Sequence, residues 1–406
     1  MTDAPDALWL QWLLQALQSA QAALLQTLHA LGLVPTLHGQ PAWPWAWRLA
    51  GDTLLFDLGQ ARRLAITLGL LTLALLLAGL ALAWRRQRLP LLALAALLPL
   101  LAPWPEWAAV RVAATPASFH ASPTGFDARS IAHGQQLYRQ LCVDCHGDDG
   151  RGHGPLAARQ PVWPPNLAGP LLWRRADGDL LWHVLHGMHD ARSNQPSMPA
   201  FAGRLSADDA WALIDAMKAL AAGQMLRQTG QWLQPVRLPA FSLRCPAAPG
   251  RTTSTDLRGQ RLRVMVPGDT APPPDPRVVT VALAPAGAGA AWPLAAGTDC
   301  QATDLAAWTA LALIAGHTAD AAALAGTQFI VDRAGWLRAR SAPGAADWQE
   351  DDLVCRAAST SFPSTSTSSA AGPVPAAGTP GNDGLGSLIA RMDAEPVRYV
   401  KGGVVH

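Results

Sequence analysis

Cys142-Val143-Asp144-Cys145-His146 is the most informative stretch of this 406-residue chain. Two cysteines separated by two residues and followed at once by a histidine form the C-x-x-C-H pattern of covalent haem attachment. Because about one helical turn separates the thiols, they suit the spacing of the two vinyl groups of haem. Redox-active cysteine pairs and half-sites for zinc also use C-x-x-C. The adjoining His146 favours haem, so we expect one haem c per chain, attached through Cys142 and Cys145, with His146 as an axial ligand of the iron.

The iron needs a second axial ligand or an open position. Met198 stands in the run Pro196-Ser197-Met198-Pro199, about fifty residues after the haem motif. Prolines restrict the backbone on both sides of this methionine, so its thioether can be held in one direction. Core filling is the ordinary role of a methionine. A proline-bounded loop is not a helix face, and we therefore expect Met198 to be the second ligand.

Helical patterns flank the two motifs. Residues 130–141 carry apolar side chains at helical spacing, and Gly134 among them would let another helix cross closely. Ser206 is the expected N-cap of that second helix, with acidic residues in its first turn.

Together these features resemble the class I cytochrome c fold over about residues 126–222. The resemblance is carried by Gly134, Tyr138, the C-x-x-C-H stretch, Gly147, Gly150, residues 152–155, 164–167 and 198–201, and the helix from Ser206. It implies an all-α domain in which His146 and Met198 are the axial ligands and a carbonyl of Pro164 or Pro165 orients the imidazole. Methionine ligation raises the reduction potential relative to two histidines, so the resemblance implies a carrier of single electrons.

Three histidines recur at every third residue in this region: His183, His186 and His189. On a helix they would share roughly one side. They could lie on a helix near the haem edge, bind copper or zinc as a second metal site, or supply a ligand that displaces Met198. These three interpretations remain open at the level of sequence.

Only 15% of the chain is charged, against about 25% in a typical soluble domain. Residues 64–84 contain no charge and are long enough to span a bilayer. Residues 89–105 form a second, proline-containing uncharged run, so we expect two transmembrane helices within 62–110. Residues 1–61 are expected to form an amphipathic helix, which lies on the membrane or packs on the spans, followed by a Trp-rich connector.

Haem attachment indicates on which side of the membrane the haem domain lies. In the bacterial families that this chain resembles, haem is attached in the periplasm. We therefore expect a bacterial inner-membrane protein with its haem domain, and the domain that follows it, in the periplasm.

Residues 236–356 alternate predicted strands and a helix, which indicates an α/β domain. This part resembles the thioredoxin-like redoxin fold, through the opening at Pro239, the run 256–260 before a strand and the hairpin that begins at Phe329. Active redoxins carry cysteines directly after the strand at 262–266, where this chain has none. Thiol–disulfide exchange needs a thiolate, so we do not expect a disulfide reductase. Residues 357–406, rich at first in Ser, Thr, Ala and Pro, are expected to be a disordered linker and tail. Within the tail a short helical segment is expected from Leu388 to Glu395, ended by Pro396.

Cys245, Cys300 and Cys355 are left after haem attachment. Two of them could pair in an oxidising compartment. We expect Cys245 to pair with Cys300, and the alternative is that all three are small buried hydrophobic side chains.

The order of membrane helices, cytochrome and degenerate redoxin resembles the C-terminal part of copper-resistance-D-related cytochrome proteins. We predict a membrane-anchored electron carrier whose partners are redox proteins in or on the membrane and membrane lipid. A net charge of +2 and the lack of a basic patch argue against nucleic acid. Two alternatives remain: a haem-fed thiol or peroxide reductase with Cys245 as nucleophile, or a copper-handling module. An enzymatic activity is therefore left open, with an electron carrier favoured.

Overall fold

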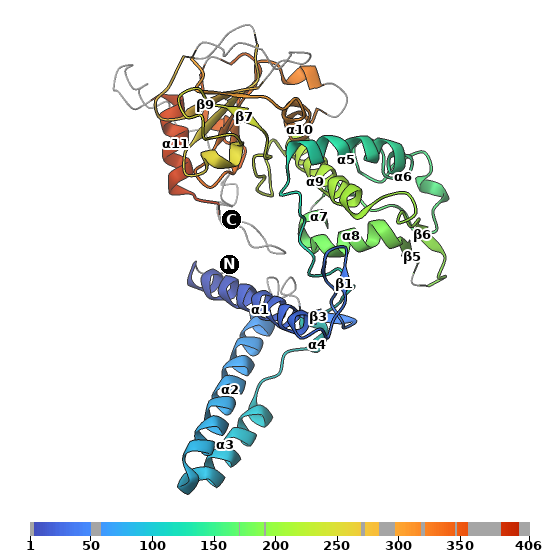
Figure 1. Cartoon of the computed structure of the whole chain (residues 1–406), viewed down its shortest axis with the longest axis vertical. Coiled ribbons are helices and arrows are strands. Elements are labelled where there is room, and N and C mark those ends of the chain that lie inside the picture. The colour runs from blue at the N-terminus through green and yellow to red at the C-terminus, as the bar shows by residue number, and fades with distance from the viewer. Residues whose placement is uncertain are drawn as a thin grey trace, which may run out of the picture. The chain divides into compact units, whose positions relative to one another are not determined.

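The computed structural model describes residues 4–49, 58–169, 171–190, 192–268, 273–283, 297–317, 321–345, 347–355 and 383–397. Within these residues the chain forms two compact units, which divide after His120. Each unit has its own buried apolar clusters, and the two are described separately below (Figure 1).

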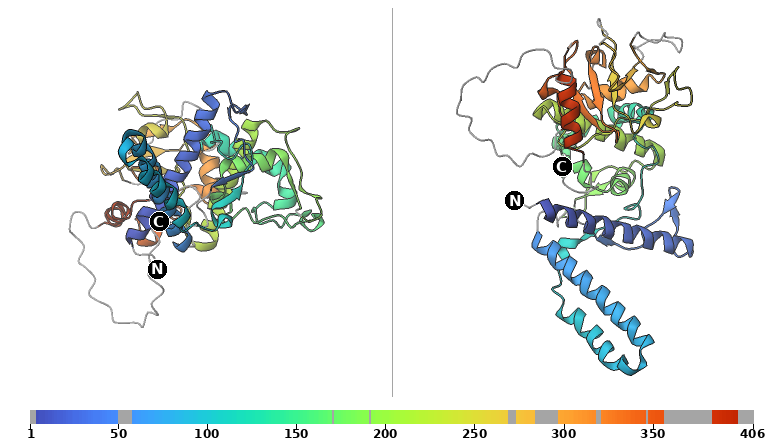
Figure 2. Two further views of the ribbon diagram at one scale, coloured as in Figure 1. Left: turned by 90° about the horizontal axis from the view of Figure 1, so that it is seen from below. Right: turned by 90° about the vertical axis from the view of Figure 1, so that its left-hand side faces the viewer.

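The first unit is mainly helical. Its elements are α1 (Ala4–Ala30), β1 (Thr36–Leu37), β2 (Gln40–Pro41), β3 (Trp47–Leu49), α2 (Leu58–Ala83), α3 (Arg88–Leu101), α4 (Trp107–Val110) and β4 (Arg111–Ala113). Helices α2 and α3 form an antiparallel hairpin, seen side by side in Figures 1 and 2. Strand β3, which precedes the hairpin in the chain, pairs with β4, which follows it.

By length and composition, one described helix of this unit could cross a bilayer. Helix α2 has 26 residues, or about 39 Å at 1.5 Å per residue. Helix α3 has 14 residues, or about 21 Å, less than the roughly 30 Å of a hydrocarbon core. It ends at Leu101 because Ala102 is extended before Pro103. Helix α3 is therefore too short to cross the bilayer as the second spanning helix that the sequence predicted.

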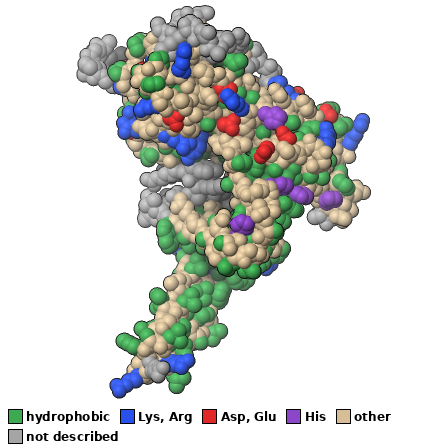
Figure 3. Space-filling model, viewed as in Figure 1, with side chains coloured by type: hydrophobic (Ala, Val, Ile, Leu, Met, Phe, Trp, Pro, Cys, Tyr) green, Lys and Arg blue, Asp and Glu red, His purple; other side chains and the backbone are tan. Residues whose placement is uncertain are grey.

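The α2–α3 hairpin presents a largely apolar surface with basic side chains at its tip (Figure 3). Helix α1 lies against its base, where Leu13 and Leu14 pack on Ala61 and Leu64. Gln21 of α1 is buried and both donates to and accepts from the backbone of Leu49. Helix α1 thus packs on the expected spanning segment through its apolar side.

The second unit begins with a helical half. Its elements are α5 (Ala128–Leu141), α6 (Val143–His146), α7 (Leu171–Arg174), α8 (Asp177–His186), β5 (Met188–His189), β6 (Pro196–Met198) and α9 (Ala207–Thr229). Helix α9 begins at the expected N-cap, where Ser206 forms a capping box with Asp209. Helices α5 and α9 cross at Gly134, where a Cβ atom would lie 2.8 Å from the backbone nitrogen of Leu213. The predicted close crossing at this glycine is confirmed.

The rest of the second unit is a mixed six-stranded sheet. Its elements are β7 (Leu243–Arg244), β8 (Leu262–Met265), β9 (Val279–Ala282), β10 (Cys300–Ala302), α10 (Ala306–Ile314), β11 (Gln328–Val331), β12 (Leu337–Arg340) and α11 (Gly384–Ala394). The strand order is β12-β11-β8-β9-β10-β7. Pairs β8–β9 and β9–β10 are parallel, and the other three are antiparallel. The helix of this half starts at Ala306, after the sheet strand at residues 300–302.

The two halves of this unit share an interface. Helix α10 packs on both α5 and α9 (Figure 1). The approach is close because Gly223 of α9 lies against α10, where an added Cβ would be 2.8 Å from the nitrogen of Gly316.

Helix α11 lies in the segment that the sequence predicted to be a disordered linker and tail. Leu385, Leu388 and Met392 are buried against Ile330, Ala339 and other side chains of the sheet half. Fully buried Arg338 donates to the carbonyls of Met392 and Glu395 at the end of the helix. The helical segment predicted from Leu388 is confirmed, and the helix starts earlier than predicted, at Gly384. Its apolar side packs on residues of the sheet half that lie more than thirty positions earlier in the chain.

Candidate haem site

The C-x-x-C-H stretch forms one turn of helix between α5 and the following loop. The backbone nitrogen of His146 donates to the carbonyl of Cys142 at 2.8 Å, and Cys145 bonds to the same carbonyl at 3.2 Å. Gly147 ends the turn with a φ of 77°, a conformation that favours glycine. Two thiols and an imidazole therefore project from a single turn, as the spacing predicts.

These three side chains line a cavity of about 330 Å³ that Met198 also lines. This volume lies within the range of roughly 300–1,000 Å³ for small-molecule sites. Most of the remaining lining is apolar, including Leu180 and Phe201. The structure thus gathers all four predicted site residues around one apolar cavity, although Met198 lies far from the others in sequence.

The thiols differ from those of a redox-active pair. Burial raises the pKa of the Cys142 thiol to about 12, and the neighbouring Cys145 adds to the effect. Burial also raises the pKa of Cys145, whose sulfur accepts from Gln160 Nε2 at 3.6 Å. Redox-active C-x-x-C motifs lower the pKa of one thiol instead. The raised pKa values of both thiols argue against thiol exchange by this pair.

His146 has the surroundings of a ligand. Burial lowers its pKa, and the nearby Pro165 carbonyl opposes the effect. The Nδ1 atom is buried and has no hydrogen bond of normal geometry. A neutral imidazole is the form that binds a metal, and a backbone carbonyl close to a histidine ring is a common way of orienting such a ligand. Pro165 is one of the two prolines that the resemblance to cytochrome c indicated.

Met198 reaches the cavity from a two-stranded hairpin. In this hairpin β5 pairs with β6 and Met188 lies opposite Met198. The turn before β5 needs Gly187, because an added Cβ would lie 2.9 Å from the nitrogen of Ala200. Met188 and Met217 line the same cavity. Sequence reasoning missed both, since Met217 follows an ordinary helical pattern and Met188 stands among histidines.

The three regularly spaced histidines do not form a common site. His183 lines the haem cavity, whereas His186 stacks on Trp182 with ring centroids 3.7 Å apart. His189 is exposed in β5, beyond the end of α8. Among the described residues no group of three potential metal ligands is found. The alternative of a second metal site at these histidines is therefore not supported.

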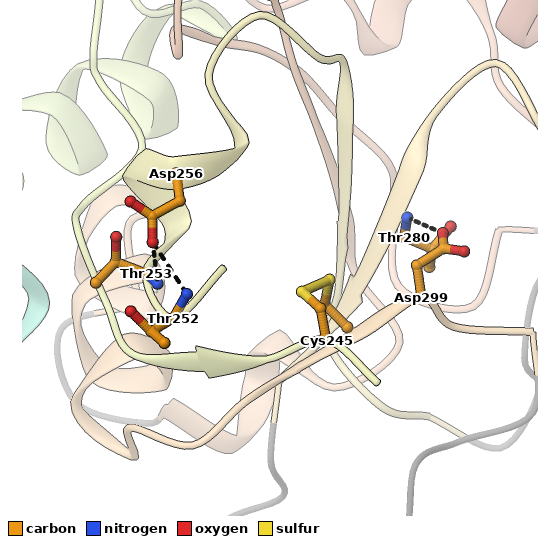
Figure 4. The surroundings of a disulfide bond; sticks show 7 residues. Cys245, Thr252, Thr253, Asp256, Thr280 and Asp299 are labelled. Carbon is orange, nitrogen blue, oxygen red and sulfur yellow. Dashed lines mark hydrogen bonds between the residues drawn. A yellow bond between two sulfur atoms is a disulfide. The ribbon is translucent and has the colours of Figure 1, made fainter. Parts of the chain in front are cut away.

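Cys245 and Cys300 form a disulfide that joins β7 to β10 (Figure 4), so the predicted pairing is confirmed. Both residues are buried. The adjoining backbone is held by carboxylates: Asp256 accepts from the nitrogens of Thr252 and Thr253, and Asp299 from the nitrogen of Thr280. A buried, oxidised Cys245 lacks the accessible thiolate that the proposed reductase would need.

The remaining thiol, Cys355, is also unsuited to attack. It is fully buried, and burial raises its pKa to about 11. Its backbone carbonyl accepts from Arg338 Nε at 3.1 Å, which is a structural contact.

Comparison with solved structures finds a chain of a reducing HAO-like protein complex from Kuenenia stuttgartiensis. It is 26% identical over 31% of this chain and 59% of that one, with a TM-score of 0.22. Less than two thirds of that chain is covered, and no argument about function is drawn from it. No curated protein matches the chain.

Residues 129–215 match the family model described as cytochrome C oxidase, cbb3-type, subunit III. The match covers the α5 helix, the C-x-x-C-H turn, the β5–β6 hairpin and the first part of α9. The chain therefore contains a c-type cytochrome domain, and the cofactor of that domain is a covalently bound haem c with its iron.

Proposed function

We propose that this protein is a membrane-anchored periplasmic cytochrome that carries single electrons between redox partners in or on the membrane. The observation that carries the proposal is the apolar cavity lined together by Cys142, Cys145, His146 and Met198. Bound haem c supplies a one-electron iron couple. The chain's own residues then decide how the group is held, how far water is excluded and which potential it has.

In this proposal the two thiols hold the haem through thioether bonds. His146 and Met198 would both hold the iron, which would leave no position there for a substrate. Methionine ligation and an apolar lining both favour the reduced, less charged state of the iron. These features suit electron transfer better than chemistry on a bound substrate.

Met198 is favoured over the two other methionines of the cavity by its backbone. Pro196 and Pro199 restrict the chain around it, and its strand is held by pairing with β5. Met188 is 37% exposed, and Met217 belongs to the buried face of α9 that packs the domain. Since Met188 lies on the partner strand, the flanking prolines and the lower exposure distinguish Met198 as the best placed of the three to serve as a constant ligand.

The ligand assignment is tested by replacing the two paired methionines separately. Met198→Ala should remove the weak sulfur-to-iron charge-transfer band of the oxidised protein and lower the reduction potential. Met188→Ala is the matched control and should keep both. The assignment fails if Met198→Ala retains the band, and loss of the band in Met188→Ala alone would transfer the role to Met188.

Anchoring rests on α2, which is long and apolar enough to cross a bilayer. Alkaline washing of membranes should leave the full chain in the pellet. Protease added outside spheroplasts should cut the cytochrome domain, which would support the periplasmic side. Release by alkaline washing would argue against anchoring, and protection from the protease would argue against the orientation.

For the sheet half we propose a thioredoxin-like relationship with a docking or structural role. Strands β8 and β9 are parallel and β11 and β12 follow antiparallel on the other side of β8, an order that supports the relationship. The Cys245–Cys300 disulfide is buried, and α10 packs on the cytochrome helices. These features favour a scaffold over a reductase. The resemblance to copper-resistance-D-related proteins is based on domain order, on the segment from Ala114 to the haem motif and on the run at 178–182. It adds no copper chemistry to the haem site.

A further inference from the structure

The return leg of the α2–α3 hairpin, defined as α3 together with residues 102–106, reaches back to the start of α2. The backbone nitrogen of Glu106 donates to Gln60 Oε1 at 2.9 Å, and Gln60 lies in the first turn of α2. Helix α3 supplies about 21 Å of the leg. The non-helical segment adds up to about 16 Å, at roughly 3.3 Å per residue. The leg as a whole is therefore long enough for a hydrocarbon core of roughly 30 Å, although α3 alone is not.

The non-helical segment finds polar partners on α2. Irregular backbone at membrane depth must be hydrogen-bonded by the protein, because lipid offers no partner. Pro103 and Pro105 have no backbone N–H, which reduces the number of donors to be paired. The carbonyl of Pro103 accepts from the hydroxyl of Thr67 at 3.2 Å. Thr67 is 1% exposed, so α2 buries a polar side chain where the segment needs one.

Trp104 supplies the remaining hydrogen bonds within the leg. Its backbone nitrogen donates to the carbonyl of Ala102 at 2.9 Å. Its indole Nε1 donates to the carbonyl of Pro99 at 3.0 Å. That carbonyl has no helical donor, because the residue four positions later is Pro103. Both backbone N–H groups of residues 103–106 therefore have partners, as a segment in hydrocarbon requires.

The two legs pack through small side chains and present leucines outward (Figure 3). Ala74 and Ala81 of α2 and Ala95 of α3 are buried. Small residues at an interface let helices approach closely in lipid. The outward leucines are 74–80% exposed and come from both legs: Leu75, Leu82, Leu89 and Leu100. This arrangement suits a pair of legs surrounded by hydrocarbon.

Tryptophans lie at both ends of this apolar surface. Trp84 is 60% exposed at the tip, and Trp104 and Trp107 lie at the base with ring centroids 5.8 Å apart. Tryptophan is enriched at both membrane–water interfaces. Because its neighbours in the chain bond to Thr67 and Gln60, Trp104 lies between these two residues along α2. The distance from that level to Trp84 is roughly 30 Å at 1.5 Å per residue, which equals the thickness of the hydrocarbon core.

We propose that the chain crosses the bilayer twice, once by α2 and once by the leg of α3 and residues 102–106. The inference rests on the proposed membrane anchoring and specifies its topology. The partner of the exposed leucine surface is lipid hydrocarbon. Both ends of the hairpin then lie on one side of the membrane, where β3 pairs with β4. The tip, with exposed Arg86 and Arg88, lies on the other side.

The accessibility of single introduced cysteines in the full-length, haem-loaded chain tests this topology. Ser19→Cys lies on α1 before the hairpin, Gln87→Cys at its tip and Ala108→Cys after it, and each of these positions is exposed. A membrane-impermeant maleimide is added to spheroplasts and to inverted vesicles. We expect Ser19→Cys and Ala108→Cys to react in spheroplasts, and Gln87→Cys only in inverted vesicles. The unaltered protein gives the background, since Cys355 is buried.

The possible labelling patterns separate this proposal from the periplasmic location. Reaction of Ser19→Cys and Ala108→Cys from opposite sides would overturn the second crossing. Reaction of all three variants from one side would mean that the hairpin does not cross, which overturns the proposal as well. The reverse pattern, with only Gln87→Cys reacting in spheroplasts, would support two crossings and contradict the periplasmic side.

Thr67→Val tests the hydrogen bond between α2 and the return leg. Valine keeps the shape of threonine but cannot donate to the Pro103 carbonyl. We expect amide hydrogen exchange within residues 104–106, measured in lipid nanodiscs, to become at least fivefold faster. Thr72→Val is the matched control, because the Thr72 hydroxyl is exposed and bonds to a carbonyl of its own helix. Equal exchange in the two variants would overturn the role of Thr67 in the second crossing.

Discussion

Replacement of Gly134 by alanine tests the helix crossing that supports the haem site. In an isolated helix this change would be favourable by about 1 kcal/mol, since alanine has the higher helix propensity. In this protein an added Cβ would lie far inside van der Waals contact with the Ala212 carbonyl and 2.8 Å from the nitrogen of Leu213. Both contacts involve backbone atoms of α9, which cannot rotate away as a side chain can.

The helices would therefore have to separate at the crossing. Overpacking of a well-packed core costs about 1–3 kcal/mol, and a clash with backbone belongs at the upper end of that range. After the gain in helix propensity, we expect a net loss of about 2 kcal/mol. For a unit of this size that loss corresponds to a fall in Tm of about 4–8 °C. Cys142, at the end of α5, and Met217, on α9, line the haem cavity, so the haem spectrum should change as well.

Thermal unfolding of the haem-loaded protein, followed by Soret absorbance and circular dichroism, measures the effect. Gly203→Ala is the control, because an added Cβ there meets nothing within 4 Å and should change Tm little. A Gly134→Ala variant as stable as the unaltered protein, or more stable, would refute the reasoning. That result would mean that the backbone of α9 can shift at little cost, and that glycine is not required for the crossing.

Three further predictions concern the second unit. Burial raises the pKa of Asp215 to about 6. This group's stabilising contribution is therefore complete below about pH 4, and about 3 kcal/mol is lost as pH rises from about 4 through 6. Asp215→Asn should remove that fall in the free energy of unfolding, measured by denaturant titration across pH, whereas Asp208→Asn should retain it. Replacing Cys245 and Cys300 together by alanine removes a disulfide with a sequence separation of 55. The free energy of unfolding should fall by about 4 kcal/mol, and the haem spectrum should not change. An unaltered midpoint of unfolding in urea would contradict this. Ser206→Ala removes the cap of α9 and should lower the free energy of unfolding by about 1 kcal/mol, which equal midpoints in denaturant titrations would disprove.

Structural features that depend on residues close together in the chain could be predicted from the sequence. The helical turn at Cys142–His146, the cap at Ser206 and the apolar length of α2 depend on contacts within a few positions along the chain. The close crossing at Gly134 was also predictable, because a glycine inside a strong helical pattern weakens the helix unless close packing requires it. In the same way C-x-x-C-H indicated the cofactor, since haem attachment needs both thiols and the histidine on one turn.

Other features needed the tertiary structure. Met188 and Met217 line the haem cavity, and the helix Gly384–Ala394 docks on the sheet half, through contacts between residues far apart in the sequence. The strand at residues 300–302 was missed because its partners lie in other parts of the sheet.

The chain by itself determined that a haem would be attached at Cys142 and Cys145, since that chemistry is local. Only the folded structure decided which methionines and histidines share the cavity, and that Pro103 lies beside Thr67. Such neighbours are brought together by burial of apolar surface across long stretches of chain, and that burial depends on the whole fold rather than on any one segment.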